Sequence, residues 1–284
     1  MNLPSPIQKP IVFSLPARHN PKLQELTARI DGDEELRQMW RSVNMNAMDR
    51  AGYSDHGEVH IKIVANIALR LARLLMAGGV PMSVVSDYDL TSNDAEVIVV
   101  LGAALHDLGM LVHRDNHEQH SVSLAIAKAR ELLADLYNVR ERTIILAEMA
   151  HAIVAHHWST PCLTTEAGVV KVADALDMTE GRSRIPFEAG SANIHSVSAQ
   201  AIEAVNIRAG ENLPVDIEIV MTNSAGIFQV DELLKRKLRN SSIAPYVRVV
   251  VSIEGETEKR LLEFYSIGGT TEHVRGAASD PRSE

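Results

Sequence analysis

Residues 91–120, TSNDAEVIVVLGAALHDLGMLVHRDNHEQH, end a long apolar run with an adjacent histidine and aspartate. Polar residues that can cap a helix open the segment, about nine apolar residues follow, and Gly109 closes the run. A short apolar run can also form a strand, but the capping residues and alanines favour a helix buried on nearly all sides. His106 and Asp107 would lie about 100° apart around its axis. Both could then bind one cation, which the negative end of the helix dipole also favours.

Amphipathic patterns on both sides of this segment predict further helices. In residues 54–79, apolar residues recur at spacings of three and four, and Gly78 and Gly79 end the pattern. Similar patterns occupy four other segments, residues 31–52, 121–137, 141–157 and 164–181. The fold class that these patterns predict is mainly α, a helical bundle.

The pattern changes near residue 190. Residues 215–223 and 246–254 alternate apolar and polar side chains, which is typical of strands, and residues 229–240 between them predict a short helix. Residues 195–208 and 259–267 are expected to form further strands. We therefore predict an extended, proline-rich arm at 1–30, a helical domain at 31–190, a small C-terminal α+β domain at 191–268 and a disordered tail at 269–284.

Composition narrows the class of protein. The 284 residues carry a net charge of −9, which argues against a protein that binds long nucleic acids through their phosphates. The single cysteine, Cys162, excludes an intrachain disulfide and a cysteine-rich zinc site. The N-terminus lacks the pattern of a signal peptide, and no run of about 18 apolar residues occurs. We therefore expect a cytoplasmic protein without a membrane partner.

The histidines are concentrated in the helical region. Nine of the twelve lie between His56 and His157. Any one of them is more often an ordinary core or surface histidine, but four segments bring histidines and aspartates to helix ends. Imidazole and carboxylate ligands together suit Mn, Fe, Co, Ni or Zn. Two such ions sharing a carboxylate can activate water and hold a phosphoryl group. The pattern therefore indicates a divalent metal site.

Three segments in this order resemble the HD superfamily of metal-dependent phosphohydrolases. They are HGEVHIKIVANIA at 56–68, LGAALHDLG at 101–109 and VVKVADALDMTEGR at 169–182. The resemblance covers about residues 50–190 and leaves out the arm and the C-terminal domain. It implies an HD-type helical bundle with one or two divalent ions, of Mn, Fe, Co, Ni, Zn or Mg.

The resemblance also implies a ligand set. His60, His106, Asp107 and Asp174 would hold the first ion, and Asp107 would bridge to a second. The second ion would be held by His120 and His156, with His157 in place of His156 if the helix register is shifted by one residue.

Other residues are expected to serve catalysis or to bind the substrate phosphate. His56 would be a general acid or would support a ligand, although Gly57 stands where the similar cyclic-nucleotide phosphodiesterases have asparagine. Lys171, three residues before Asp174, would face the site or the solvent. Arg182 and Arg184 follow the Asp174 helix, and an arginine fork suits phosphate oxygens.

The resemblance therefore implies a phosphohydrolase that cleaves a phosphomonoester or phosphodiester of a small, nucleotide-like substrate, with Asp107 orienting the attacking water. One alternative is a nucleotide-binding regulatory protein. Whether the protein is the phosphohydrolase or the regulatory protein, two chains could pair through an open edge of the C-terminal sheet and form a homodimer. A further alternative is an RNA-end nuclease that uses the basic patch Lys235, Arg236, Lys237 and Arg239.

Overall fold

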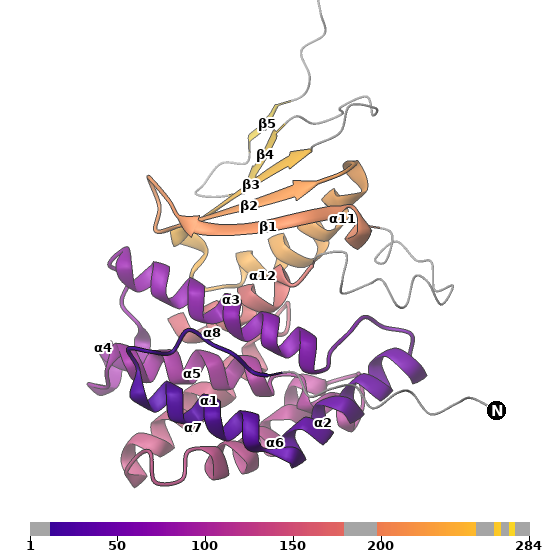
Figure 1. Cartoon of the computed structure of the whole chain (residues 1–284). Helices are drawn as coiled ribbons and strands as arrows, with labels where there is room; N and C mark the ends of the chain where they lie inside the picture. Colours follow the sequence, from indigo (N-terminus) through magenta and orange to yellow (C-terminus); the bar gives the residue numbers. More distant parts are fainter. Residues whose placement is uncertain (1–11, 179–197, 254–263, 268–272, 276–284) are drawn as a thin grey trace, which may run out of the picture.

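The computed structural model describes residues 12–178, 198–253, 264–267 and 273–275. Figure 1 shows a bundle of helices with a twisted sheet at one end. The helices of the bundle are α1 (Pro21–Gly32), α2 (Glu34–Asn44), α3 (Glu58–Ala77), α4 (Ser83–Tyr88), α5 (Ser92–Leu105), α6 (His117–Leu132), α7 (Val139–Ala155) and α8 (Thr165–Leu176). This confirms the prediction of a mainly α fold.

Helix α5 is the centre of the bundle. All but its first two residues are buried, and it packs against α3, α7 and α8. Its start is fixed by a capping box in which Thr91 and Asp94 each accept the other's backbone N–H. Burial on all sides explains why its sequence lacks a polar face.

Part of the predicted N-terminal arm is helical. Residues 1–30 were expected to be extended, but α1 begins at Pro21, where proline suits the first helical position. The Asn20 side chain caps this helix by accepting the N–H of Leu23, and its amide donates to Glu96 of α5 at 2.9 Å. The four prolines in the first sixteen residues suggested an extended chain, and this expectation was carried too far, to residue 30.

The C-terminal region contains a sheet of order β1-β2-β3-β4-β5 among the described residues. Its strands are β1 (Ile202–Ala209), β2 (Val215–Met221), β3 (Val247–Ile253), β4 (Phe264–Ile267) and β5 (His273–Arg275). β2 and β3 are parallel, and the other neighbours are antiparallel. The predicted α+β character is confirmed, but β5 pairs with β4, so residues 273–275 contradict the predicted disordered tail.

A helical crossover joins β2 to β3. It contains α11 (Ile227–Gln229), a π-helix (Val230–Lys235) and α12 (Arg236–Arg239). Figure 1 shows this crossover between the sheet and the bundle, where α12 and the π-helix contact α8. The crossover therefore brings residues of the C-terminal region to the surface of α8.

Two close approaches hold the C-terminal region against the bundle. Ser241 and Ser242 donate to backbone oxygens of α8 and its N-cap, and a Cβ at Gly168 would lie 2.3 Å from the Ser242 hydroxyl. A Cβ at Gly78 would lie 2.5 Å from Pro214. Both contacts need glycine, so the two regions fit closely. None of the helices in the described ranges is long and apolar enough to cross a membrane.

Candidate metal centre

Three overlapping groups of histidines and carboxylates meet at the ends of α3, α5, α6, α7 and α8. Within each group, the potential ligand atoms lie within 4.8 Å of one another, and every member is buried. The groups are His60–His106–Asp174, His106–Asp107–His156 and His117–Glu118–His156. Five helices far apart in sequence thus supply one cluster.

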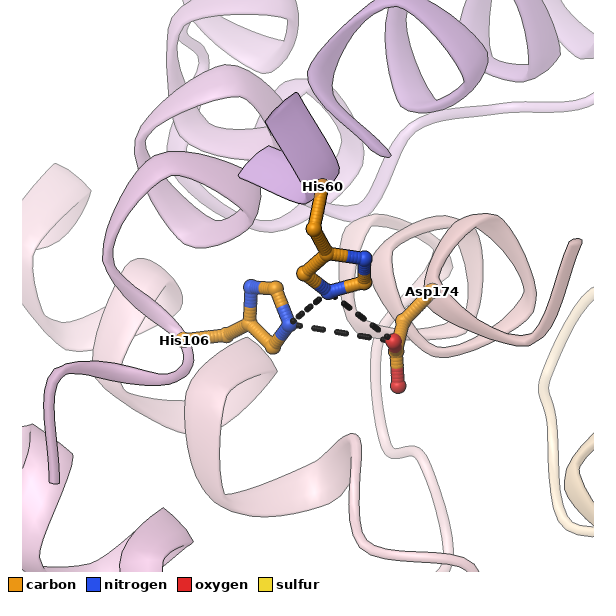
Figure 2. Close-up of side chains that lie close together, drawn as sticks. All are labelled: His60, His106 and Asp174. Atoms are coloured by element: carbon orange, nitrogen blue, oxygen red, sulfur yellow. Dashed lines mark hydrogen bonds and ion pairs between the residues drawn. The ribbon is translucent and has the colours of Figure 1, made fainter. Parts of the chain in front are cut away.

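The first half of the cluster comes from α3, α5 and α8. Figure 2 shows His60, His106 and Asp174 pointing toward one another. The Nε2 atoms of His60 and His106 lie 3.3 Å apart, and Oδ1 of Asp174 lies 3.5 Å and 3.8 Å from them, respectively. Three ligand atoms therefore surround one point.

The second half comes from His117 at the start of α6 and His156 at the end of α7. Their Nε2 atoms lie 3.3 Å apart. Asp107 lies between the halves, with Oδ1 3.3 Å from His117 Nε2 and Oδ2 3.2 Å from His106 Nε2. Its two oxygens thus face different halves, as a bridging carboxylate requires.

All four histidine rings have the same orientation, with Nε2 toward the cluster and Nδ1 outward. In each, Nδ1 lies on an acceptor oxygen. The acceptors are Asp177 Oδ2 for His60, Ala103 O for His106, Arg114 O for His117 and Ile153 O for His156. In His60, His106 and His156 the Nδ1 proton is donated outward and the Nε2 lone pair points into the cluster, which is the arrangement of a metal-binding histidine. Nδ1 of His117 lies 3.0 Å from both the Arg114 carbonyl oxygen and the Arg114 guanidinium.

The inner atoms need a positive charge between them. If His60 and His106 were both neutral in this tautomer, their Nε2 lone pairs would face each other at 3.3 Å, so a proton or a metal ion must lie between them. Oδ2 of Asp107 is also buried and accepts no hydrogen bond from the described residues. The residues present therefore fit divalent ions, as imidazole and carboxylate donors do.

The charges of the cluster shift its pKa values strongly. Burial lowers the pKa of His106, but Asp107 and Asp174 outweigh burial and raise it to about 10. Burial raises the pKa of Asp107, yet the neighbouring His106, His117 and His60 hold it well below its ordinary value. Burial and the positive charge of His106 keep the pKa of His156 well below the usual range. Asp107 is therefore ionised and His156 neutral, the states in which both bind metals.

The structure brings His117, rather than the predicted His120, into the cluster. His120 is half-buried and belongs to none of the three groups. The reason is where α6 begins: Asn116 adopts a left-handed conformation (φ 58°), and His117 is the first helical residue. Asn116 is the residue that could have indicated this start, because asparagine adopts the left-handed conformation more readily than most residues.

Other predicted residues lie in different places. His56 lies beside His60, with ring centroids 5.5 Å apart, and lines the pocket above the cluster. His157 also lines the pocket but is outside the three groups, whereas His156 is inside two of them. Arg182 and Arg184 lie outside the described residues.

Lys171 is buried away from the pocket, whereas it was expected to face the site or the solvent. Its side chain is completely buried and donates to the backbone oxygens of Thr160 and Asn240, away from the pocket. Burial lowers its pKa. Lys171 was expected near the site because it precedes Asp174 by three residues. The segment after α7 instead covers its side chain, and Thr160 of that segment accepts its hydrogen bond.

A pocket of about 400 Å³ opens onto the cluster. Its walls include three cationic residues that the phosphohydrolase prediction did not name: Arg114, and Arg236 and Lys237 of α12. Lys237 forms an ion pair with Asp174 Oδ2, and the Arg236 guanidinium lies 4.1 Å from the ring centroid of Trp158. The sequence showed these residues only as a basic stretch, and the crossover places two of them in the pocket.

Comparisons with known proteins agree with this geometry. Residues 58–179 match the family model of the HD domain. The chain is also 44% identical over 213 residues to an uncharacterized protein of Methanocaldococcus jannaschii, a match that covers 75% of this chain and 82% of the relative. No solved structure matches the chain. The chain therefore belongs to the HD superfamily of metal-dependent phosphohydrolases.

Proposed function

We propose that the protein cleaves a phosphomonoester or phosphodiester of a small, nucleotide-like substrate with two divalent ions. The observation that carries this proposal is the position of Asp107, whose two oxygens face the two halves of the cluster at 3.2 Å and 3.3 Å from ligand nitrogens. A carboxylate that bridges two ions is typical of centres that act on phosphate esters.

The first ion would be held by His60, His106 and Asp174, with one oxygen of Asp107. The second would be held by His117, His156 and the other oxygen of Asp107, with Glu118 beside them. Mn, Fe, Co, Ni, Zn and Mg are the candidate metals. When bound, such ions supply a water activated at neutral pH and neutralise charge on the phosphoryl oxygens.

Several side chains of the protein would support the reaction. Asp107, held ionised by the neighbouring histidines, would orient the attacking water. His56, whose Nδ1 bonds to the Ser54 carbonyl at 2.7 Å, would transfer a proton to the leaving oxygen through its other nitrogen. Its place on the pocket wall supports this role.

The pocket supports a small substrate with an aromatic part. Its volume of about 400 Å³ is within the range of small-ligand sites. Tyr53 and Trp158, which are 45% and 46% exposed, line it and supply aromatic surface for a base, with Arg114 and Arg236 over one face of the rings. A long RNA is a less suitable substrate, because the chain carries a net charge of −9.

The test is hydrolysis by the purified full-length chain. We would measure metal content and turnover of generic phosphomonoesters, phosphodiesters and a nucleotide panel with Mn, Co, Ni and Mg. The Asp107→Ala variant should bind neither ion tightly and should lose turnover by about 1,000-fold or more. Stoichiometric metal without turnover on any ester would instead support the nucleotide-binding regulatory protein. The mass in solution would test the predicted dimer.

A further inference from the structure

The C-terminal region reaches the metal centre through α12, and the end of this helix is held firmly. The backbone oxygen of Asn240, its C-cap, accepts the N–H of Cys162 at 3.0 Å and a bond from Lys171 at 3.3 Å. The Asn240 side chain donates to the Trp158 carbonyl at 2.9 Å. The segment between α7 and α8 therefore fixes α12 against the pocket.

Lys237 projects from α12 to a carboxylate of the cluster. Its Nζ donates to Oδ2 of Asp174, while Oδ1 of the same carboxylate lies 3.5 Å from His60 Nε2. The Lys237 side chain is only 15% exposed and lines the pocket. An ammonium group thus lies directly beside the position where the first ion would bind.

Arg236, the preceding residue, lines the same pocket. Its guanidinium is oriented by Glu232, which accepts a bond at 2.8 Å, and by the ring of Trp158 at 4.1 Å. A guanidinium carries five N–H donors in a planar fork that matches phosphate oxygens. Two cations of α12 therefore face a pocket whose floor is lined with carboxylates.

We propose that Lys237 and Arg236 form the subsite for the substrate phosphate, so that the C-terminal region completes the active site of the HD domain. The proposal rests on the proposed function for its substrate class. The bond to Asp174 uses one of the three donors of Lys237, and another can bind a phosphoryl oxygen. The family match ends at residue 179, so this subsite lies in a part of the chain that the HD domain does not include.

The test measures the affinity of the full-length, Mn²⁺-loaded protein for inorganic phosphate by calorimetry. We expect Lys237→Met to weaken phosphate binding by about 10- to 100-fold, the loss of one charge-assisted hydrogen bond. Arg236→Gln should weaken it as well. Arg239→Gln is the matched control: it removes the same charge from an exposed residue of α12 that does not line the pocket, and phosphate affinity should not change.

Two further measurements separate a phosphate ligand from a residue that only positions Asp174. Lys237→Arg keeps the charge and should retain most of the phosphate affinity, which also provides a test if Lys237→Met fails to fold. Metal content should be similar in both variants. If Lys237→Met loses metal affinity while its loaded form binds phosphate normally, or if it behaves like Arg239→Gln, the subsite is wrong. If wild type binds phosphate and Lys237→Met does not, but no ester is hydrolysed, the subsite stands and the proposed function fails.

Discussion

The two halves of the ligand cluster are built differently. His60, His106 and Asp174 lie on or at the end of α3, α5 and α8, which pack against one another through the centre of the bundle. His117 instead follows a tight turn, and its position depends on a backbone contact. A Cβ at Gly109 would lie only 1.9 Å from the His117 carbonyl oxygen. The first half is therefore fixed by helix packing, whereas in the second half His156 is held by the packing of α7 and His117 by the fit of one turn.

The halves also differ in charge. Asp174 faces the first half, and Asp177 supports His60 through a 2.6 Å bond to Nδ1, so this half has two carboxylates besides the shared Asp107, one of them paired with Lys237. The second half has Glu118, 3.4 Å from His117 Nδ1. More negative charge in a buried site strengthens cation binding. We therefore expect the first ion to bind more tightly than the second.

The largest expected effect shows whether His117 or His120 binds the second ion. His117→Ala should reduce metal content from about two ions to about one per chain and should lower turnover by about 100-fold or more, because the second half loses one of its imidazoles. Elemental analysis and ester hydrolysis measure both. His120→Ala, on the same helix, is the control and should retain both ions. The reverse result would restore the ligand set implied by the sequence resemblance.

Gly109→Ala tests whether the turn alone holds the second half. The added Cβ meets backbone atoms of His117 and Ser121, so the start of α6 must move. We expect a loss of stability of about 1–3 kcal/mol in thermal or chemical unfolding, and loss of the second ion while the first is kept. At Gly32 nothing lies within 4 Å of a Cβ, so Gly32→Ala is the control. Equal loss of both ions would show that the halves are not independent.

Asp177→Asn tests how much the negative charge of Asp177 contributes to metal binding in the first half. The amide still accepts the His60 Nδ1 proton but removes the negative charge, and metal affinity at the first site should fall by about 10- to 100-fold. Glu118→Gln should weaken only the second site. Competition with a chelator measures each affinity. If Asp177→Asn weakens the second ion more than the first, the assignment of charge to the halves is wrong.

The smallest expected effect is the release of protons when metal binds. The pKa of His106 is raised to about 10, so at pH 7 the ring is protonated without an ion and must lose a proton to bind one. Affinity should therefore fall as pH falls, and proton release should vanish above about pH 10. Without metal, the charged ring stabilises the fold below pH 6.5, and this contribution is lost as pH rises through about 10. Calorimetry in buffers of different ionisation enthalpy measures the release, and uptake of protons would contradict it.

The sequence predicted the residues whose place depends on regular helices. The resemblance implied His60, His106 and Asp174 as ligands, and all three lie in the cluster, as does His156 rather than its neighbour His157. His120 was chosen over His117 because the order of histidines does not show where α6 begins.

The places of residues that depend on tertiary packing were not predicted correctly. Lys171 precedes Asp174 by less than one helical turn, yet the chain after α7 covers it and bonds to it. Lys237 is 63 residues from Asp174, and only the crossover between two parallel strands brings it to the cluster. Local patterns contain no information about such contacts.

The most direct test of the central claim is a crystal structure of the Mn²⁺-loaded protein with anomalous scattering data. We expect two peaks, one bounded by His60, His106 and Asp174 and one by His117 and His156, each within bonding distance of a different oxygen of Asp107. A single peak, or a second ion bound to His120, would contradict the shared role of Asp107 and the two-ion function built on it.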